Sequence, residues 1–258
     1  MDSLISSLHA NFCTQMIFLS KHVPSIREIQ FGDITVIQSD VKDDTFNYIF
    51  DSKLNESNTI KEILKDFEIK ELPFAWWIGP LDSPNTLSVQ LQELGLKQTE
   101  ENIGMILNVE DYCIPCKIGN IDIKRVQNHN QLQEWCNILI QIGVSDKFYS
   151  DIYSKLPENV FSSNELEYYI GYYSNGSSNV PVCTGMLVNS NNVAGIYNIA
   201  TLPDYRRQGF ASSMMNYLIQ RSKELNLNYV TLTASPEGKL VYEPLGFQSI
   251  CSYYEYSK

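Results

Sequence analysis

The sequence predicts an α/β fold built as two successive domains, each with a sheet flanked by helices. A length of 258 residues allows one large domain or two modest ones, at about 100–200 residues per domain. Hydrophobic residues make up 43% and aromatic residues 12%, so a sizeable core is expected and wholesale disorder is not. Strand-like apolar runs alternate with helical periodicities, and a linker-like stretch at 110–120 separates two such series. We therefore expect domains at 1–115 and 116–258.

The first domain is expected to begin with an amphipathic helix. In residues 1–25 the apolar side chains are interrupted by polar ones and no basic segment precedes them, unlike in a signal peptide. The later elements follow from β-branched and aromatic runs and from helical apolar spacing. The predicted strands are 34–38, 46–50, 73–79 and 103–109, and the predicted helices run from 58 or 59 to 67 and over 87–94, where Gly95 ends the second.

The second domain shows a longer alternation of the same kind. A polar turn, SNGSSN, joins two apolar runs into an expected hairpin. The predicted strands are 121–126, 166–173, 182–189, 193–202, 229–234 and 250–256, and the predicted helices are 129–142, 146–156, 209–225 and 237–245.

An internal repeat becomes visible when two Leu-Gly pairs are aligned. SPNTLSVQLQELGL (83–96) follows the apolar run FAWWIG, and SPEGKLVYEPLGF (235–247) follows YVTLTA. Gly95 and Gly246 lie 151 residues apart, and both halves read strand, Ser-Pro turn, helix, Leu-Gly, strand. The pattern favours a duplicated fold over a chance likeness.

The net charge is −11, from 30 acidic and 19 basic side chains, and this argues against nucleic acid as a partner. Residues 1–115 carry 8 Lys and Arg against 18 Asp and Glu, whereas 116–258 carry 11 against 12. An acidic first half fits a surface that keeps the protein dissolved. It equally fits a surface that attracts a cationic substrate.

Several other classes are disfavoured by what the sequence lacks. No stretch reaches the roughly 18–20 apolar residues of a membrane span, so no membrane partner is expected. Six cysteines are scattered without a disulfide framework, and we expect a reducing cytoplasm. Cys113 and Cys116 have redox-motif spacing but no second pair that would complete a zinc site. The histidines at 9, 22 and 129 lack metal-ligand spacing, and no metal is expected.

The stretch GIYNIATLPDYRRQGFASSMMNYLI (195–219) carries the clearest chemical signal. It begins as a strand, turns, and enters a helix at Gly209 with the pattern R-x-x-G-x-A. A helix N-terminus presents up to four unpaired N–H groups and about half a unit of positive charge. Gly209 has no Cβ and lets an anion approach the backbone, while Arg206, Arg207 and Ser212 add cationic and hydroxyl groups. A diphosphate is the expected guest; the alternative is a plain helix start with surface arginines.

These residues resemble the GNAT superfamily of acyl-CoA-dependent N-acyltransferases. The match runs from IYNIAT through the turn and helix to YVTLTASPEGKLVYEPLGF, whose end is similar to the family's closing motif N-x-x-A-x-x-L-Y-x-x-L-G-F. The resemblance is strong over about 190–250 and extends back to 121. It implies two GNAT-like domains, each with a mixed, mostly antiparallel twisted sheet, and a splayed pair of strands in the C-terminal one.

The resemblance also implies a site for acetyl-CoA as acyl donor. Ile199, Ala200 and Thr201 are expected to offer backbone hydrogen bonds to the pantetheine arm. Ser235 stands where the family often has a cofactor-binding Asn. The diphosphate is expected on the amides of Arg206, Arg207, Gln208, Gly209, Phe210, Ala211 and Ser212.

Tyr242 occupies the family's general-acid position, from which a hydroxyl can protonate the departing thiolate. The alternative is an aromatic side chain that only packs its helix, in a chain with 16 tyrosines. A backbone N–H on the splayed strand is expected to stabilise the tetrahedral oxyanion. The family often has a Glu on this strand as base, but 196–201 contains no carboxylate; Tyr197 and Asn198 are candidates for holding a water or for a purely structural role.

The first domain is expected to have lost such a site. KLNESNT (53–59) stands where the phosphate turn would be, without a glycine, and Leu91 aligns with Tyr242. We interpret this half as a scaffold and one wall of the acceptor pocket, with Trp76 and Trp77 as core and interface residues. Only one strand follows the last helix, so we expect the strand near 103–109 to complete the second sheet.

The function expected from these features is acetyl transfer from acetyl-CoA to a primary amine, by direct attack in a ternary complex. The acceptor is expected to be a small molecule or a peptide amine. Two alternatives stay open at this point. One is a non-catalytic acyl-CoA sensor or scaffold, favoured by the missing carboxylate and by Ser235. The other is a transferase for a longer acyl chain.

Overall fold

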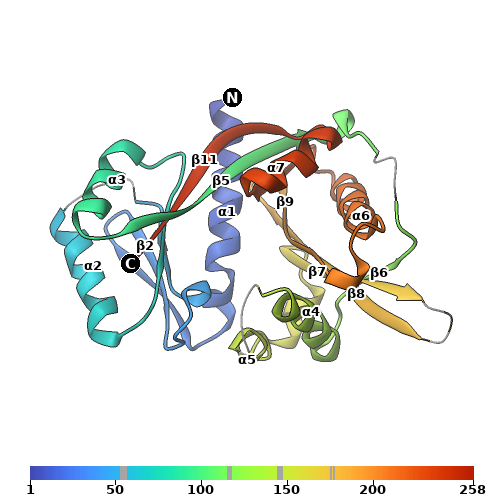
Figure 1. Cartoon of the computed structure of the whole chain (residues 1–258), viewed down its shortest axis with the longest axis horizontal. Helices are drawn as coiled ribbons and strands as arrows, with labels where there is room; N and C mark the ends of the chain where they lie inside the picture. Colours follow the sequence, from blue (N-terminus) through green and yellow to red (C-terminus); the bar gives the residue numbers. More distant parts are fainter. Residues whose placement is uncertain (53–56, 115–117, 144–147, 175, 177) are drawn as a thin grey trace. The chain divides into compact units, whose positions relative to one another are not determined.

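The computed structural model describes residues 1–52, 57–114, 118–143, 148–174, 176 and 178–258 (Figure 1). Helices and strands alternate along the chain, which confirms the predicted α/β class. The chain folds into two compact units. The first unit comprises Met1–Gly104, Thr233–Lys239 and Ser249–Lys258, and the second unit comprises Met105–Leu232 and Leu240–Gln248.

The first unit contains a mixed sheet with helices on both faces. Its elements are α1 (Asp2–His22), β1 (Ile26–Phe31), β2 (Ile34–Ser39), β3 (Tyr48–Phe50), α2 (Ser57–Lys70), β4 (Ala75–Ile78), α3 (Pro84–Glu93), and most of β5 (Lys97–Asn108) and β11 (Gln248–Ser257). The strand order is β1-β2-β3-β4-β11-β5. Strands β3 and β4 are parallel, whereas the pairs β1–β2, β2–β3 and β4–β11 are antiparallel.

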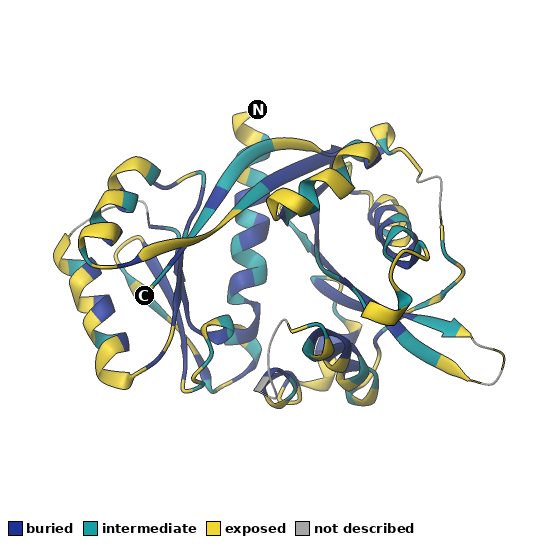
Figure 2. Ribbon diagram, viewed as in Figure 1, coloured by how far each residue is buried: buried dark blue, intermediate teal, exposed yellow. Residues whose placement is uncertain are grey.

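Alternation along the strands explains the two covered faces of this sheet. Ile49 and Trp76 belong to a buried cluster with apolar residues of α2 and α3. Their neighbours point the other way: the Tyr48 hydroxyl donates to the Met16 carbonyl of α1, and Trp77 packs on Phe12. Figure 2 shows β2, β3 and β4 largely buried and the outer sides of α2 and α3 exposed. The predicted N-terminal amphipathic helix and the core position of Trp76 are thus confirmed.

The second unit repeats this three-layer arrangement. Its elements are β6 (Asp122–Arg125), α4 (His129–Gln141), α5 (Phe148–Tyr153), β7 (Leu166–Ser174), β8 (Asn179–Ser190), β9 (Val193–Thr201), α6 (Phe210–Glu224), β10 (Tyr229–Ala234) and the end of α7 (Pro236–Tyr242). The order continues β5-β10-β9-β8-β7-β6, with only β9 and β10 of the registered pairs parallel. Trp135 of α4 packs on Tyr168, while Tyr217 of α6 packs on Tyr169, so the two helices cover opposite faces of β7.

The duplicated fold inferred from the Leu-Gly pairs is visible in both units. β3–α2–β4 and β9–α6–β10 each consist of a strand, a helix and a parallel strand. Each motif is followed by a further helix and a glycine with positive φ, 89° at Gly95 and 101° at Gly246. The last strands of the two repeats are exchanged: β11 lies between β4 and β5 in the first unit, and Met105–Asn108 of β5 belongs to the second.

The expectation that a strand near 103–109 completes the second sheet is confirmed. β5 adjoins β10 in the strand order, and the Val109 N–H donates to the Asn228 carbonyl at 2.9 Å. The division into 1–115 and 116–258 stays a prediction about independent domains, since compactness alone does not say which stretch folds by itself. The compact units do not coincide with that single cut, because β5 and β11 each pass from one unit to the other.

Some predicted boundaries differ from the observed ones. β1 has an exposed, charged pattern and was not predicted, and β5 begins at Lys97 rather than 103. Helix α3 begins at Pro84 because proline suits a first helical turn. The predicted helix 237–245 is α7 followed by a 3₁₀ turn at Glu243–Leu245. Four residues of KLNESNT, 53–56, lie outside the described residues, as does Cys116 of the Cys-x-x-Cys pair.

Candidate functional site

The parallel strands β9 and β10 part early in the second unit. Their register joins Tyr229 to Val193 and ends at Thr231 and Gly195. Strand β9 continues from Ile196 to Thr201 beyond this last pair. Its peptide groups there have no registered β10 partner on that side, which is the splayed geometry that the family resemblance implies for this pair.

A β-bulge interrupts β9 on its other side. In the pairing with β8, Thr184 lies opposite Ala200 but Met186 lies opposite Tyr197, so β9 has one extra residue here. Asn198 adopts a left-handed conformation with φ 53°, a region that asparagine tolerates better than most side chains. The Thr184 Oγ1 hydroxyl donates to the Asn198 carbonyl at 2.8 Å. A bulge takes a residue out of the regular ladder and redirects its peptide groups.

The turn between β9 and α6 is tightly folded. A 3₁₀ turn at Pro203–Tyr205 follows the strand, and the Arg206 Nε donates to the Thr201 carbonyl at 3.1 Å. Arg207 has φ 62° and Gly209, the N-cap of α6, has φ 86°. Backbone segments that mix right- and left-handed residues can turn successive N–H groups to one side, an arrangement that favours anions.

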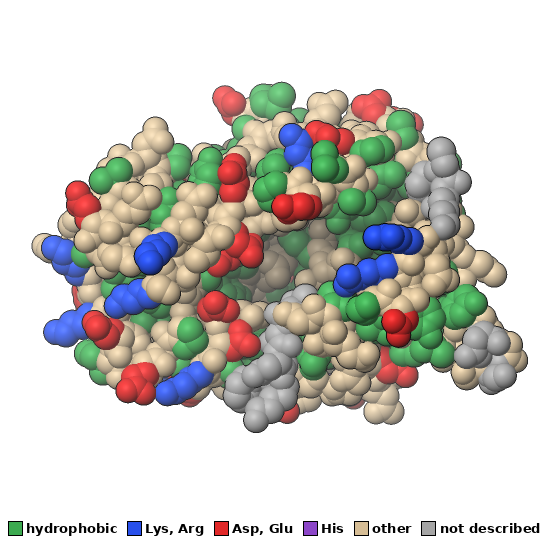
Figure 3. All heavy atoms as spheres, viewed as in Figure 1, with side chains coloured by type: hydrophobic (Ala, Val, Ile, Leu, Met, Phe, Trp, Pro, Cys, Tyr) green, Lys and Arg blue, Asp and Glu red, His purple; other side chains and the backbone are tan. Residues whose placement is uncertain are grey.

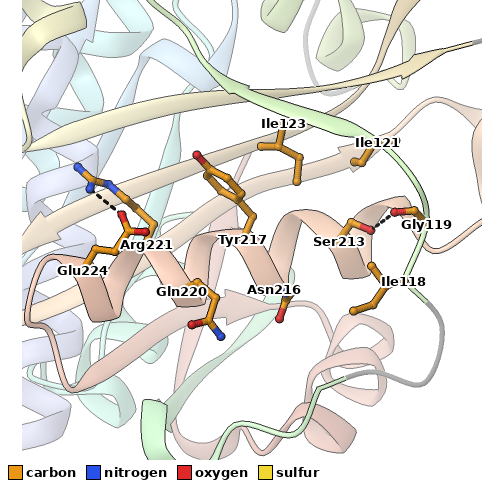
Figure 4. Close-up of a pocket in the computed structure, with 10 residues that line it drawn as sticks. All are labelled: Ile118, Gly119, Ile121, Ile123, Ser213, Asn216, Tyr217, Gln220, Arg221 and Glu224. Atoms are coloured by element: carbon orange, nitrogen blue, oxygen red, sulfur yellow. Dashed lines mark hydrogen bonds and ion pairs between the residues drawn. The ribbon is translucent and has the colours of Figure 1, made fainter.

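Gly119, shortly before β6, is hydrogen-bonded to this turn and to the first turns of α6. The Gly119 N–H donates to the Gly209 carbonyl at 3.1 Å, and the Ser213 Oγ donates to the Gly119 carbonyl at 2.6 Å (Figure 4). A Cβ on Gly119 would lie 2.6 Å from the Gln208 carbonyl oxygen and even closer to the Phe210 ring. Only glycine therefore permits this approach. A groove of about 340 Å³ runs beside it, between 118–123 and the outer side of α6.

The far end of α6 is fixed by a buried ion cluster. Glu167 on β7 is 1% exposed and accepts from Arg221 of α6 at 2.9 Å, while Arg125 of β6 lies 3.0 Å away. Burial alone raises the pKa of Glu167, but the hydrogen bonds from Arg221 and Tyr169 and the charge of Arg125 outweigh it, and the pKa is lowered. The carboxylate is thus fully paired, as a buried charge requires. Helix α6 is held at both ends.

Tyr242 ends α7, and its ring packs edge-on against Phe247 at 5.9 Å between centroids. Burial raises the pKa of its phenol, so the hydroxyl stays protonated at neutral pH. Within the described part of the chain this hydroxyl makes no hydrogen bond to protein, and it is therefore available as a donor.

The structure brings most of the predicted site residues together in the second unit. Ile199, Ala200 and Thr201 lie on the part of β9 that has no registered partner in β10, and residues 206–212 follow after the 3₁₀ turn. Ser235 belongs to the first unit, where its exposed hydroxyl accepts from the Gly238 N–H at 3.1 Å and so caps α7. Asn198, a candidate for holding a water or for a structural role, lies in the bulge, with its side-chain amide nitrogen 3.9 Å from the Met186 sulfur.

Thr184, Gly119 and Ser213 are the structural contributors that the sequence reasoning missed. Gly119 was assigned to a linker, although a glycine shortly before a strand can signal a close backbone approach. Thr184 and Ser213 look like ordinary strand and helix residues in the sequence. In the described residues no group of three or more His, Cys, Asp or Glu side chains is arranged to hold a metal. Likewise, across those residues no helix is long and apolar enough to cross a membrane.

Comparison with known proteins finds a family match for part of the chain. Residues 132–247 match the model of the acetyltransferase (GNAT) family. A GCN5-related N-acetyltransferase from Kribbella flavida has a similar structure, with a TM-score of 0.71 and 15% identity over 98% of this chain and 95% of that one. One from Sphaerobacter thermophilus gives 0.59 and 10%, over 89% and 82%. No curated protein matches in sequence.

A tandem GNAT protein from the clavulanic acid biosynthesis pathway also has this fold, with a TM-score of 0.58 and 8% identity over 94% of this chain and 86% of that one. Identities this low show the fold alone. Residues 132–247 thus match the GNAT family, and the chain as a whole has the fold of GCN5-related N-acetyltransferases, a tandem form among them. The resemblance predicted from the sequence is confirmed.

Proposed function

We propose that the protein transfers the acetyl group of acetyl-CoA to a primary amine by direct attack in a ternary complex. The observation that carries the proposal is the order of features along one backbone stretch. A strand freed from its parallel neighbour bears a bulge, and a turn with two left-handed residues leads directly into the N-terminus of α6. Family membership of 132–247 supports acyl transfer as the reaction class.

Each part of this stretch has a distinct task in the proposal. The amides from Arg206 to Ser212 bind the diphosphate of CoA, aided by the helix N-terminus and by two arginines. The backbone of Ile199–Thr201 binds the pantetheine arm as an added strand would, through main-chain hydrogen bonds. The Ser235 hydroxyl accepts from the Gly238 N–H and so caps α7, and no cofactor contact is assigned to it. Binding is thus assigned mainly to main-chain groups.

The chemical step forms a C–N bond and breaks the C–S bond. The free amine attacks the thioester carbon, and the tetrahedral oxyanion is stabilised by a backbone N–H at the bulge of β9. As the C–S bond breaks, the Tyr242 hydroxyl gives its proton to the CoA sulfur, and the phenol regains a proton from solvent. The raised pKa of Tyr242 keeps it in the protonated form that this role requires. The amide product releases its surplus proton to water.

The proposed acceptor is a basic small molecule or peptide amine. Excess negative charge lies in 1–115, and Figure 3 shows acidic side chains on the first unit interspersed with basic ones. An amine with a pKa of about 10.4 is only roughly 0.1% free base at neutral pH, so proton removal is part of the reaction. The proposed compartment is a reducing cytoplasm, because the spacing of the six cysteines shows no disulfide framework.

One observation favours a second candidate function. The strand segment 196–201 contains no carboxylate that would serve as base, as a non-catalytic acyl-CoA sensor would allow. The two candidates differ in Tyr242, because a sensor has no use for an acid beside the thioester.

An amine panel tests the proposal directly. Polyamines, amino acids, aminoglycosides and peptides are incubated with the protein and acetyl-CoA, and release of the CoA thiol is followed. We expect acceptor-dependent release with at least one class, and a parallel series with longer acyl-CoA donors defines the chain length. Binding of acetyl-CoA without release for any amine would support the sensor instead, and absence of binding would contradict both.

A further inference from the structure

The peptide between Asn198 and Ile199 is the centre of the bulge in β9. Its carbonyl belongs to Asn198 and its N–H to Ile199, within one planar unit. In a trans peptide these two groups point in opposite directions. Whatever fixes the direction of the Asn198 carbonyl therefore also fixes the direction of the Ile199 N–H.

One side-chain hydrogen bond fixes the direction of the Asn198 carbonyl. Thr184 of β8 is fully buried, and its Oγ1 donates to the Asn198 oxygen at 2.8 Å. The bond forms where the β8–β9 register shifts, so regular ladder bonds do not by themselves determine this peptide's orientation. Asn198 also sits at φ 53°, a conformation that costs about 1–2 kcal/mol for a side-chain-bearing residue and persists only where its surroundings hold it.

The residue of β8 that faces the bulge is held as well. The Trp135 Nε1 of α4 donates to the Gly185 carbonyl at 3.2 Å. A Cβ on Gly185 would also lie 2.8 Å from Met214 and 2.9 Å from Leu218, both on α6. Gly185 is thus packed between α4 and the helix whose N-terminus forms the proposed diphosphate site. Because its neighbour Gly185 is held by two helices, Thr184 has a fixed backbone position from which its hydroxyl reaches the Asn198 carbonyl.

We infer that Thr184 is a positioning residue for acyl transfer. Its hydroxyl holds the Asn198–Ile199 peptide so that the Ile199 N–H points away from Thr184, on the side where β9 has lost its parallel partner. That N–H is then the donor to the thioester carbonyl oxygen and, more strongly, to the oxyanion formed on attack. The inference rests on the proposed function, and it adds the side chain that aims the donor.

Three substitutions isolate the hydroxyl. Thr184→Val keeps the shape and removes the donor, and Thr184→Ser keeps the donor. Thr231→Val is the matched control in the same sheet, because the Thr231 hydroxyl is equally buried and has no hydrogen-bond partner in the described residues. Thr184→Ala removes the donor without the valine methyl and replaces the valine variant if that variant does not fold.

The first readout separates chemistry from binding. We expect Thr184→Val to lower kcat about ten-fold or more with the most active amine of the panel, since a misdirected oxyanion donor loses part of its effect. The dissociation constant for CoA itself should stay within about two-fold, because the diphosphate turn is untouched. Thr184→Ser and Thr231→Val should retain kcat within about three-fold.

The second readout does not depend on turnover. Acetyl-CoA labelled with ¹³C at the carbonyl is bound to each protein, and the infrared carbonyl band is measured. A hydrogen bond from the Ile199 N–H moves the band to lower frequency than in free acetyl-CoA. We expect this shift in the wild-type protein, in Thr184→Ser and in Thr231→Val, and a shift at least halved in Thr184→Val.

The outcomes distinguish the inference from the function beneath it. Wild-type values of both kcat and band position in Thr184→Val, or equal losses in Thr231→Val, overturn the role of Thr184 while acyl transfer stands. A wild-type protein that does not bind acetyl-CoA overturns both. A band shift that depends on Thr184 in a protein without turnover supports the aimed N–H and removes the transferase function.

Discussion

The carboxyl ends of the two parallel strand pairs show how one backbone plan becomes two different regions. In the second unit, β9 runs on from Ile196 to Thr201 after its pairing with β10 has ended. In the first unit, β3 is three residues long and stops at Phe50. The equivalent helix begins soon after each strand, so the two regions differ in the strand end rather than in the fold.

Side chains fill the corresponding end in the first unit. Asp51 turns the chain with φ 57°, and the Trp76 Nε1 donates to the buried Ser52 hydroxyl at 3.2 Å. His9 of α1 packs so closely on the residue after β4 that a Cβ on Gly79 would lie 2.7 Å from its ring. The ring is held by Tyr253 at 3.2 Å and lies 3.6 Å from Asp51. Main-chain groups line the strand end in one unit, and side chains close it in the other.

The difference teaches that a sheet of this type does not itself specify a binding site. The first unit retains the parallel pair, the following helices and the terminal glycine of the second. In its described residues it lacks the strand extension and the bulge, and the His9 imidazole lies beside the strand ends. Leu91, which aligns with Tyr242, is fully buried in its core.

The largest effect, a loss of folding, is expected when residues 116–258 are produced without residues 1–115. A fragment of residues 116–258 lacks Met105–Asn108, which belongs to the second unit beside β10, and it leaves β11 without β4. We expect it to be insoluble or to lack fixed tertiary structure in near-ultraviolet circular dichroism and NMR. A folded fragment that binds CoA would show that the second region needs nothing from residues 1–115.

The next largest effect is expected when one added side chain fills the space beside the turn before α6. Gly209→Val places a branched Cβ where an anion approaches, and we expect the affinity for CoA to fall about 100-fold or more in calorimetry. The substitution also strains a residue at φ 86°. Gly95→Val is the matched control, because Gly95 has φ 89° and a Cβ there meets no atom within 4 Å. Equal affinities for all three proteins would remove the turn from the binding site.

Tyr242, the proposed general acid, is the next difference between the regions. We expect Tyr242→Phe to lower kcat about 100-fold, because the leaving thiolate loses its proton donor, while the dissociation constant for CoA is nearly unchanged. Stability should change little, since the ring contact with Phe247 does not involve the hydroxyl. Turnover like that of the wild type would make Tyr242 a packing residue, as Leu91 is.

The smallest effect is expected in the first unit, at the strand ends beside which the His9 ring lies. Asp82 is 8% exposed, and its Oδ1 has no hydrogen-bond partner within the described residues. Burial, together with the charge of Asp51, raises its pKa, although the Gly79 N–H and His9 act in the opposite direction. Folding therefore favours the protonated form of this carboxyl over the ionised form. The stability that the protonated carboxyl contributes is lost as the pH rises through the raised pKa.

Asp82→Asn should accordingly raise the free energy of unfolding in urea by about 1 kcal/mol at pH 7. The gain should shrink as the pH falls through the raised pKa, where the wild-type carboxyl takes up its proton. Acetyl transfer should be unchanged. A large loss of turnover in this variant would mean that the first unit's strand end takes part in the reaction.

Local pattern made much of this structure predictable. The apolar run at Tyr229–Ala234 gives a strand with the observed bounds, and the Leu-Gly pairs reveal the repeat. The turn at Gly209 is recognisable because glycine, arginine and a helix start occur together. These features depend on residues close in sequence.

The remainder depends on register and on distant contacts. The bulge exists only through the pairing of β8 with β9, and Thr184 meets a carbonyl 14 residues away. Ser213 bonds across 94 residues to Gly119. The placement of β11 is set by its pairing with Trp76–Ile78, which no local pattern encodes. Long-range pairing is the information that propensity and periodicity lack.

The exchanged strand β11 has a consequence for synthesis on the ribosome. Residues up to Gly104 emerge early, but the strand between β4 and β5 comes from Ser249–Lys258. At about 5–20 residues per second, the intervening chain takes roughly 7–30 s to translate. During that interval the edge of β4 that pairs with β11 has no partner, and this sheet is completed only after residues 249–258 have been made.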